Sequence, residues 1–172
     1  MLIECALRTN LAKFCRLFKM CCHVMFLQLP ARIIRNRHLL KYCGECLFDL
    51  SLAKFLVLFV PFNRWKRSYG YFQCESLKND VACYRQELFA IRRSIQCVAK
   101  CVPWRSKCLD QAMAAQRMLK RRGLSSTLYF GMVKDQEKKW LAHAWVRCGD
   151  QWLIGYYPSI PYTVVGTYAW LA

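Results

Sequence analysis

The sequence has few of the residues that characterise chains without a packed core. Only 7 of its 172 residues are glycine and 5 are proline, which excludes collagen-like and low-complexity proteins. Hydrophobic residues make up 56% and charged residues 22%, so the chain is not disordered as a whole. No internal repeat is visible. The length fits one domain, or one catalytic domain with a helical extension.

Acidic residues are also scarce. The chain has 10 Asp and Glu against 27 Lys and Arg, a formal net charge of +17. This excess favours an acidic ligand, partner or surface. The 12 cysteines do not indicate a disulfide framework, because such frameworks belong to short secreted chains that lack a core.

A secretory signal and a clean membrane-spanning run are both missing from the pattern. Residues 1–29 are apolar, but basic residues are scattered through them and no small-residue cleavage site follows. The longest apolar stretch, residues 46–62, contains Asp49 and Lys54. An ionisable residue near the centre of a spanning helix costs about 2.5–3.5 kcal/mol. We therefore interpret this stretch as a buried or interfacial helix, and expect a cytoplasmic protein with free thiols that is either soluble or membrane-associated.

Residues 25–102 are basic and helical in pattern. Apolar side chains recur at spacings of three and four, and prolines separate the runs. The pattern predicts helices near residues 31–42, 45–60 and 78–100. A basic, aromatic connector is expected at residues 63–74.

Residues 103–172 have a mixed pattern. A helical stretch begins at Pro103 and ends at Gly123, directly after three basic residues that complement the helix dipole. Strands are predicted at residues 126–133, 140–148 and 151–156, separated by turn residues. The aromatic tail that follows contains two prolines, which keep it irregular or at a sheet edge. One helix followed by antiparallel strands predicts an α+β fold.

Two side chains of this second half are a candidate nucleophile and base. Cys108 lies near the start of the predicted helix, where partial positive charge favours a thiolate, and Arg105 and Lys107 add to that charge. His143 is the only histidine of this half and lies mid-strand between two alanines, which leave room for a facing helix. A thiolate at a helix start facing an imidazole on a sheet is the arrangement of papain-like and transglutaminase-like enzymes. The residue types alone leave open that both side chains are structural.

Three segments add a family resemblance. They are PWRSKCL at residues 103–109, LYFGMVK at 128–134 and AHAWV at 142–146. Together they resemble the leader-cleaving cysteine proteases of lasso-peptide biosynthesis, the microcin-processing type within the transglutaminase-like superfamily. Residues 27–62 are more loosely similar to the helical front of stand-alone members.

The resemblance implies a function and a set of partners. Such proteases remove the leader from a ribosomally made precursor peptide, and a separate ATP-dependent cyclase then closes the core peptide into a macrolactam. By position, Cys108 is the nucleophile and His143 the general base and later acid. No cofactor or metal is implied, and nucleic acid is not an expected partner. A separate small protein is expected to recognise the precursor, because the segment before Pro103 lacks the strands of a fused recognition module.

The third catalytic residue departs from the family pattern. The family commonly places an Asp shortly after the His strand, where it orients the imidazole. The only acidic residue after His143 is Asp150, which makes it the tentative orienting acid by elimination. Asp150 follows Gly149, however, and a turn explains an Asp there without any catalytic role. The next strand offers Gly155 and two tyrosines, so a backbone carbonyl or a tyrosine hydroxyl is an alternative, and a decayed site is another.

The resemblance divides the chain into three segments. Residues 1–24 are interpreted as a non-native or disordered extension, 25–102 as a helical N-terminal region, and 103–172 as the transglutaminase-like cysteine protease core. The basic helical half is expected to pack on that core, whose cysteine-bearing helix lies against an antiparallel sheet. The alternative functions are a catalytically decayed binding or scaffold protein of the same fold, and a basic protein of the membrane surface.

Two further patterns allow more than one interpretation. Cys43 and Cys46 have the spacing of zinc or redox ligands, and Cys97 and Cys101 could supply a second pair, but buried apolar thiols explain all four. The connector carries a basic-aromatic cluster with four interpretations: a solvated face over core aromatics, a docking surface for a leader or partner, a contact with anionic lipid, or a surface that stacks nucleic-acid bases. Its members are Arg64, Trp65, Lys66, Arg67, Tyr69, Tyr71 and Phe72.

Overall fold

A computed structural model of the chain describes residues 37–134 and 137–172. Residues 1–24, which the sequence analysis interprets as an extension, lie outside the described residues. The longer elements are helices α3 (Arg37–Phe59), α5 (Arg85–Cys101) and α6 (Cys108–Lys120), and strands β2 (Ser126–Lys134), β3 (Trp140–Cys148), β4 (Gln151–Ile154) and β5 (Thr163–Trp170). The shorter ones are α4 (Phe62–Trp65), η1 (Lys66–Tyr69), β1 (Tyr71–Phe72) and η2 (Ala82–Tyr84).

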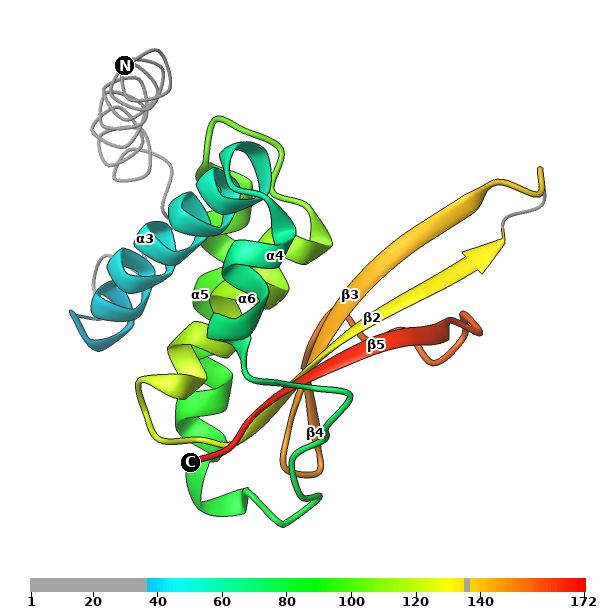
Figure 1. Cartoon of the computed structure of the whole chain (residues 1–172). Helices are drawn as coiled ribbons and strands as arrows, with labels where there is room; N and C mark the ends of the chain where they lie inside the picture. Colours follow the sequence, from blue (N-terminus) through cyan, green and yellow to red (C-terminus); the bar gives the residue numbers. More distant parts are fainter. Residues whose placement is uncertain (1–36, 135–136) are drawn as a thin grey trace.

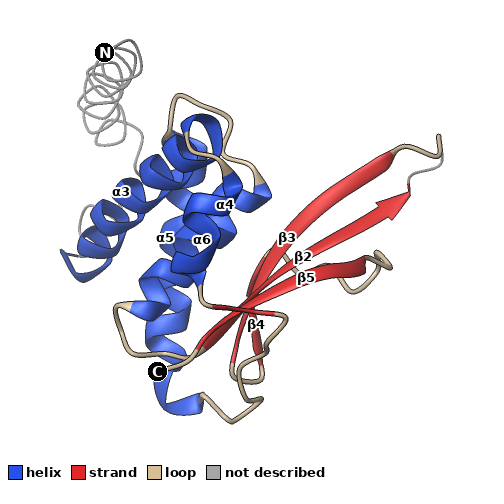
Figure 2. Cartoon of the chain, in the orientation of Figure 1, coloured by secondary structure: helices blue, strands red, loops and turns tan. Residues whose placement is uncertain are grey.

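The strands form one antiparallel sheet in the order β1-β5-β2-β3-β4. The helices gather on one side, and β2, β3 and β5 run out beyond them as a projecting arm (Figures 1 and 2). The predicted α+β fold, with the cysteine-bearing helix against an antiparallel sheet, is confirmed. Within the described ranges, no helix is long and apolar enough to cross a membrane.

The core forms where α6 crosses the sheet. Ala112 and Ala115 of α6 are fully buried, and their small side chains let the helix approach β3, where Ala144 and Val146 are buried in the same cluster. The large apolar side chains of α3 and α5 complete this core from the other side of α6. The first residue of α6, Cys108, is thereby held close to the sheet.

Helix α3 is continuous where the sequence pattern predicts two helices with a break at residues 43–44. Gly44 lies within it, and a glycine inside a helix costs only about 1 kcal/mol relative to alanine. Burial of Cys43, Leu47 and Leu50 on the inner face outweighs that cost. The predicted break is therefore wrong, because tertiary packing overrides a local preference.

Strand β5 is the second difference from the sequence pattern, which predicts an irregular or edge segment after residue 156. Residues 157–162 are irregular, but the chain then pairs with β2 over most of the length of β5. The two prolines at 158 and 161 both precede the strand, so they do not interrupt its hydrogen bonds. β5 is consequently an inner strand of the sheet where β1 covers its C-terminal half.

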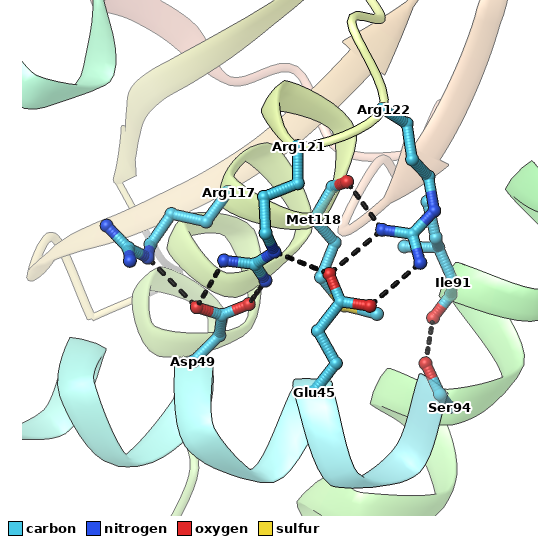
Figure 3. Close-up of polar contacts among 8 residues, drawn as sticks. All are labelled: Glu45, Asp49, Ile91, Ser94, Arg117, Met118, Arg121 and Arg122. Atoms are coloured by element: carbon cyan, nitrogen blue, oxygen red, sulfur yellow. Dashed lines mark hydrogen bonds and ion pairs between the residues drawn. The ribbon is translucent and has the colours of Figure 1, made fainter. Parts of the chain in front are cut away.

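Ion pairs dock α3 onto the C-terminal end of α6 (Figure 3). Asp49 is fully buried and receives Arg117 at 2.9 Å and both terminal nitrogens of Arg121. Glu45, one turn earlier, accepts a bidentate pair from Arg122 at 2.8 and 2.9 Å. Asp49, which interrupts the apolar stretch of residues 46–62, thus faces the arginines at the end of α6, which explains how a charge is accommodated in a buried helix.

Candidate active site

Cys108 is the first residue of α6 and is half-buried. The backbone N–H of Lys107 donates to Asp110 Oδ2 at 3.0 Å, which caps the helix. Lys54 of α3 reaches the same carboxylate oxygen at 3.4 Å and the Arg105 carbonyl at 3.2 Å. The buried Asp110 therefore fixes both the start of the helix and the loop before it, and with them the position of the thiol.

The start of α6 also provides hydrogen-bond donors. The Gln111 N–H donates to the Lys107 carbonyl at 3.1 Å and so begins the helical ladder. The backbone N–H groups of the three residues before Gln111, starting with Cys108, precede the ladder and have no acceptor within the helix. These N–H groups form the positive end of the helix dipole, which can stabilise an oxyanion next to the thiol.

His143 lies in β3 opposite Gly131 and is half-buried. Its Nε2 lies 2.5 Å from the Gly155 carbonyl oxygen. A carbonyl only accepts hydrogen bonds, so Nε2 carries the proton, and in the neutral imidazole Nδ1 is the basic nitrogen. Gly155 therefore orients the ring and selects the tautomer that a general base requires.

The conformation of Gly155 makes this contact possible. Its φ is +79°, in the left-handed region, and a Cβ at this position would lie 2.6 Å from the Ala144 carbonyl oxygen. Only glycine fits both the backbone conformation and this close approach to β3. The absent side chain lets the Gly155 carbonyl approach His143.

Aromatic rings surround the imidazole. Tyr162 stacks on it with ring centroids 4.9 Å apart, Tyr157 lies at 5.5 Å and Trp145 at 6.0 Å. Burial raises the pKa of the Tyr162 hydroxyl, and the nearby Cys108 and Tyr157 raise that pKa further. Tyr162 therefore contacts the imidazole with its ring. Tyr162 belongs to the aromatic tail, and its place beside His143 was not predicted, because a tyrosine in an irregular loop carries no local signal.

Cys108 and His143 line the same cavity, which has a volume of about 450 Å³. Gln111 of α6, Gly155 and Arg92 of α5 line it too. Arg92 donates from Nε to the Leu153 carbonyl at 2.7 Å and from Nη2 to the Trp152 carbonyl, so its positive charge is fixed at the cavity wall. The structure thus brings together the two side chains proposed as nucleophile and base.

The structure does not bring Asp150 to this cavity. Asp150 is exposed in the turn between β3 and β4, and its N–H donates to the Asn79 carbonyl at 3.1 Å. His143 lies seven residues back along β3, about 20 Å away at the rise of an extended strand. The group that contacts His143 is the Gly155 carbonyl, one of the alternatives left open by the sequence.

The four cysteines with zinc-like spacing lie in the helical core. Cys43, Cys46, Cys97 and Cys101 are all buried. Burial raises the pKa of Cys43 to about 11, and Cys97 and Cys101 contribute to the increase, so this thiol is protonated at neutral pH. In residues 37–134 and 137–172, no group of three or more His, Cys, Asp or Glu side chains is arranged to hold a metal.

Comparison with known protein families identifies the superfamily to which the chain belongs. Residues 56–167 match the transglutaminase-like superfamily, Transglut_core3, over a range that includes Cys108, His143 and Gly155. The chain belongs to the transglutaminase-like superfamily. This transglutaminase-like fold includes cysteine proteases, and the cysteine at a helix start beside a strand histidine agrees with that chemistry. No curated protein and no solved structure matched the chain.

Proposed function

We propose that this transglutaminase-like protein is a cysteine endopeptidase that removes the leader from a lasso-peptide precursor. The observation that carries the proposal is the shared cavity of Cys108 and His143, with the imidazole held by Gly155. The resemblance of residues 103–109, 128–134 and 142–146 to leader-cleaving proteases supplies the substrate. We place the reaction in the cytoplasm, with a separate recognition protein as partner and an ATP-dependent cyclase as the next enzyme.

The proposed mechanism uses this chain's own groups. His143 Nδ1 accepts the Cys108 proton, and the thiolate attacks the scissile carbonyl carbon. The N–H groups at the start of α6 stabilise the resulting oxyanion. The imidazolium then protonates the leaving amine, which becomes the N-terminus of the core peptide. Water, deprotonated by the neutral imidazole, hydrolyses the thioester and releases the leader.

The test is cleavage of a lasso-peptide precursor, monitored by mass spectrometry with the recognition protein present. We expect Cys108→Ala to abolish cleavage while circular dichroism shows a folded protein. Cys83→Ala is the matched control, because Cys83 is an exposed thiol in η2 and does not line the cavity. It should cleave as the wild type does.

One observation favours a second candidate function, a binding protein whose catalytic site has decayed. The group that orients His143 is a neutral carbonyl and not the acid of the family pattern. Wild-type protein that binds the precursor but leaves it intact, with the recognition protein present, would support this second function and overturn the first.

A further inference from the structure

A groove on the opposite side of the first turn of α6 has no role in the chemistry described above. Its volume is about 790 Å³, and we refer to it as the basic groove, defined by Phe62, Lys66, Arg67, Phe72, Leu109 and Val165. Leu109 directly follows Cys108, and Cys108 and Gln111 line the catalytic cavity. Both hollows are therefore lined by residues of the first turn of α6, although they share no lining residue.

The walls of the basic groove are apolar and its charge is positive. Phe62 meets Phe130 and Tyr168 edge-on, with ring centroids 6.3 and 6.2 Å apart. Lys66 Nζ lies 5.8 Å from the Phe62 ring centroid, and Arg67 is exposed beside it. Among the described residues, neither cation forms an ion pair with a carboxylate. The basic groove thus offers two unneutralised cations above an aromatic floor.

One wall of the basic groove is an open sheet edge. β1 pairs with β5 only at Tyr168 and Ala169, and Gln73 adds one hydrogen bond to the Thr167 carbonyl at 2.9 Å. Within the described ranges, Thr163, Val164 and Gly166 pair with β2, Val165 is a bulge without a β2 partner, and no strand pairs with residues 163–166 on the other side. Val165 and Gly166 of this free edge line the groove. An exposed edge strand is a template for an added extended peptide.

We propose that the basic groove binds an extended, acidic segment of the peptide substrate, which pairs with residues 163–166 and places its carboxylates at Lys66 and Arg67. This inference rests on the proposed endopeptidase function, since Leu109 of the groove directly follows Cys108 in the sequence. The basic-aromatic cluster of the sequence therefore divides: Trp65 and Tyr69 are buried in the core, whereas the two cations and Phe72 face the substrate.

Binding is tested separately from cleavage, with full-length Cys108→Ala protein and fluorescence anisotropy. The probes are a labelled peptide of Glu–Val repeats and its counterpart with Gln in place of Glu. We expect the Glu peptide to bind about tenfold more tightly at low salt, and the preference to fall as salt screens the charges. Equal binding of the two peptides would overturn the inference.

The groove itself is tested by charge reversal. Lys66→Glu with Arg67→Glu should weaken binding of the Glu peptide about tenfold, since two attractive pairs become repulsive. Lys78→Glu with Arg85→Glu is the control, because it changes the net charge equally at exposed positions outside the groove. It should change binding by no more than about twofold. Equal effects of the two double variants would attribute binding to net charge and overturn the inference.

Two further measurements test whether the peptide pairs with the strand edge and whether the groove binds lipid instead. Hydrogen exchange at the amides of residues 163–166 should slow in the presence of the Glu peptide, and unchanged exchange would overturn the strand pairing. Vesicles of phosphatidylserine and phosphatidylcholine should not compete with the peptide; full competition would identify the groove as a lipid contact. Precursor cleavage by wild-type protein is scored independently. Cleavage without groove-dependent binding refutes this inference alone, whereas groove-dependent binding without cleavage refutes the endopeptidase.

Discussion

Gly155→Ala is the sharpest test of the site, because it changes the group that holds His143 without touching a catalytic side chain. The left-handed backbone conformation costs an alanine about 1–2 kcal/mol. The new Cβ would lie 2.6 Å from the Ala144 carbonyl oxygen, whereas ordinary contacts begin at 3.4 Å. The backbone must therefore move by about 0.8 Å, and such overpacking adds about 1–3 kcal/mol. We expect a total loss of about 2–5 kcal/mol in the free energy of unfolding.

The same movement carries the Gly155 carbonyl away from His143. A displacement of about 1 Å at a reacting group can cost up to about a hundredfold in rate. We expect kcat for precursor cleavage to fall at least about tenfold with little change in KM, because the carbonyl orients the base and does not bind the peptide. Urea denaturation and cleavage kinetics, at a temperature where the variant is folded, give the two quantities.

Gly123→Ala provides a matched control. Gly123 has a φ of +65° at the end of α6, and a Cβ there would meet nothing within 4 Å. This variant should lose only the backbone cost of about 1–2 kcal/mol and should cleave like the wild type. A folded Gly155→Ala protein with wild-type kcat would refute the assignment of the Gly155 carbonyl as the orienting group. A Gly123→Ala protein with the same loss of kcat would show that general destabilisation explains the effect.

Three other predictions follow from the structure. Asp150→Asn should leave precursor cleavage within about twofold of wild type, because Asp150 lies in a turn about 20 Å from His143; a loss of tenfold or more would restore it as the orienting acid. Asp49→Asn should lower the free energy of unfolding, measured in urea, by about 3 kcal/mol, because it removes a fully buried carboxylate that pairs with two arginines. Glu137→Gln is the control in an exposed ion pair and should change the free energy of unfolding by less than about 0.5 kcal/mol. Burial acts to raise the pKa of the Glu45 carboxyl, but hydrogen bonds from two arginines outweigh burial and lower that pKa. The associated stability is present at neutral pH and is lost as the pH falls through the folded-state pKa, so Glu45→Gln should flatten the acid limb of stability measured in urea.

The parts of the site that depend on local sequence could be predicted. The end of α6 shortly before Gly123 has a strong local signal. Its start does not, since the pattern predicts a helix from Pro103 and α6 begins at Cys108. The strand that carries His143 was predicted with the bounds that β3 has. These elements alone do not pair Cys108 with His143, because a cysteine near a helix start and a histidine in a strand can both be structural. The pairing was predicted from the family resemblance. The continuous α3 could not be predicted, since its stability at Gly44 comes from contacts with distant helices.

The orienting group could not be predicted for a different reason. A backbone carbonyl has no signature in the sequence, because each residue carries one and only the fold decides where it points. The sequence therefore offered only Asp150 as an orienting acid, because it is the only acidic residue after His143. What the sequence does contain is the glycine itself, at a position where a side chain would collide with β3.

The carbonyl of Gly155 changes how charge is balanced during catalysis. A carboxylate at this position would need a Cβ 2.6 Å from the Ala144 carbonyl oxygen, so the backbone that presents the carbonyl also excludes the acid. A carbonyl fixes the imidazole tautomer as an acid does, but it brings no negative charge to stabilise an imidazolium. In the proposed mechanism the negative sulfur, in contrast, lies at the positive start of α6, in a cavity that Arg92 also lines. The proposed Cys108–His143 pair is therefore stabilised electrostatically mainly around the cysteine. His143 depends on its orientation by the Gly155 carbonyl, so the conformation of this glycine should control the rate of cleavage.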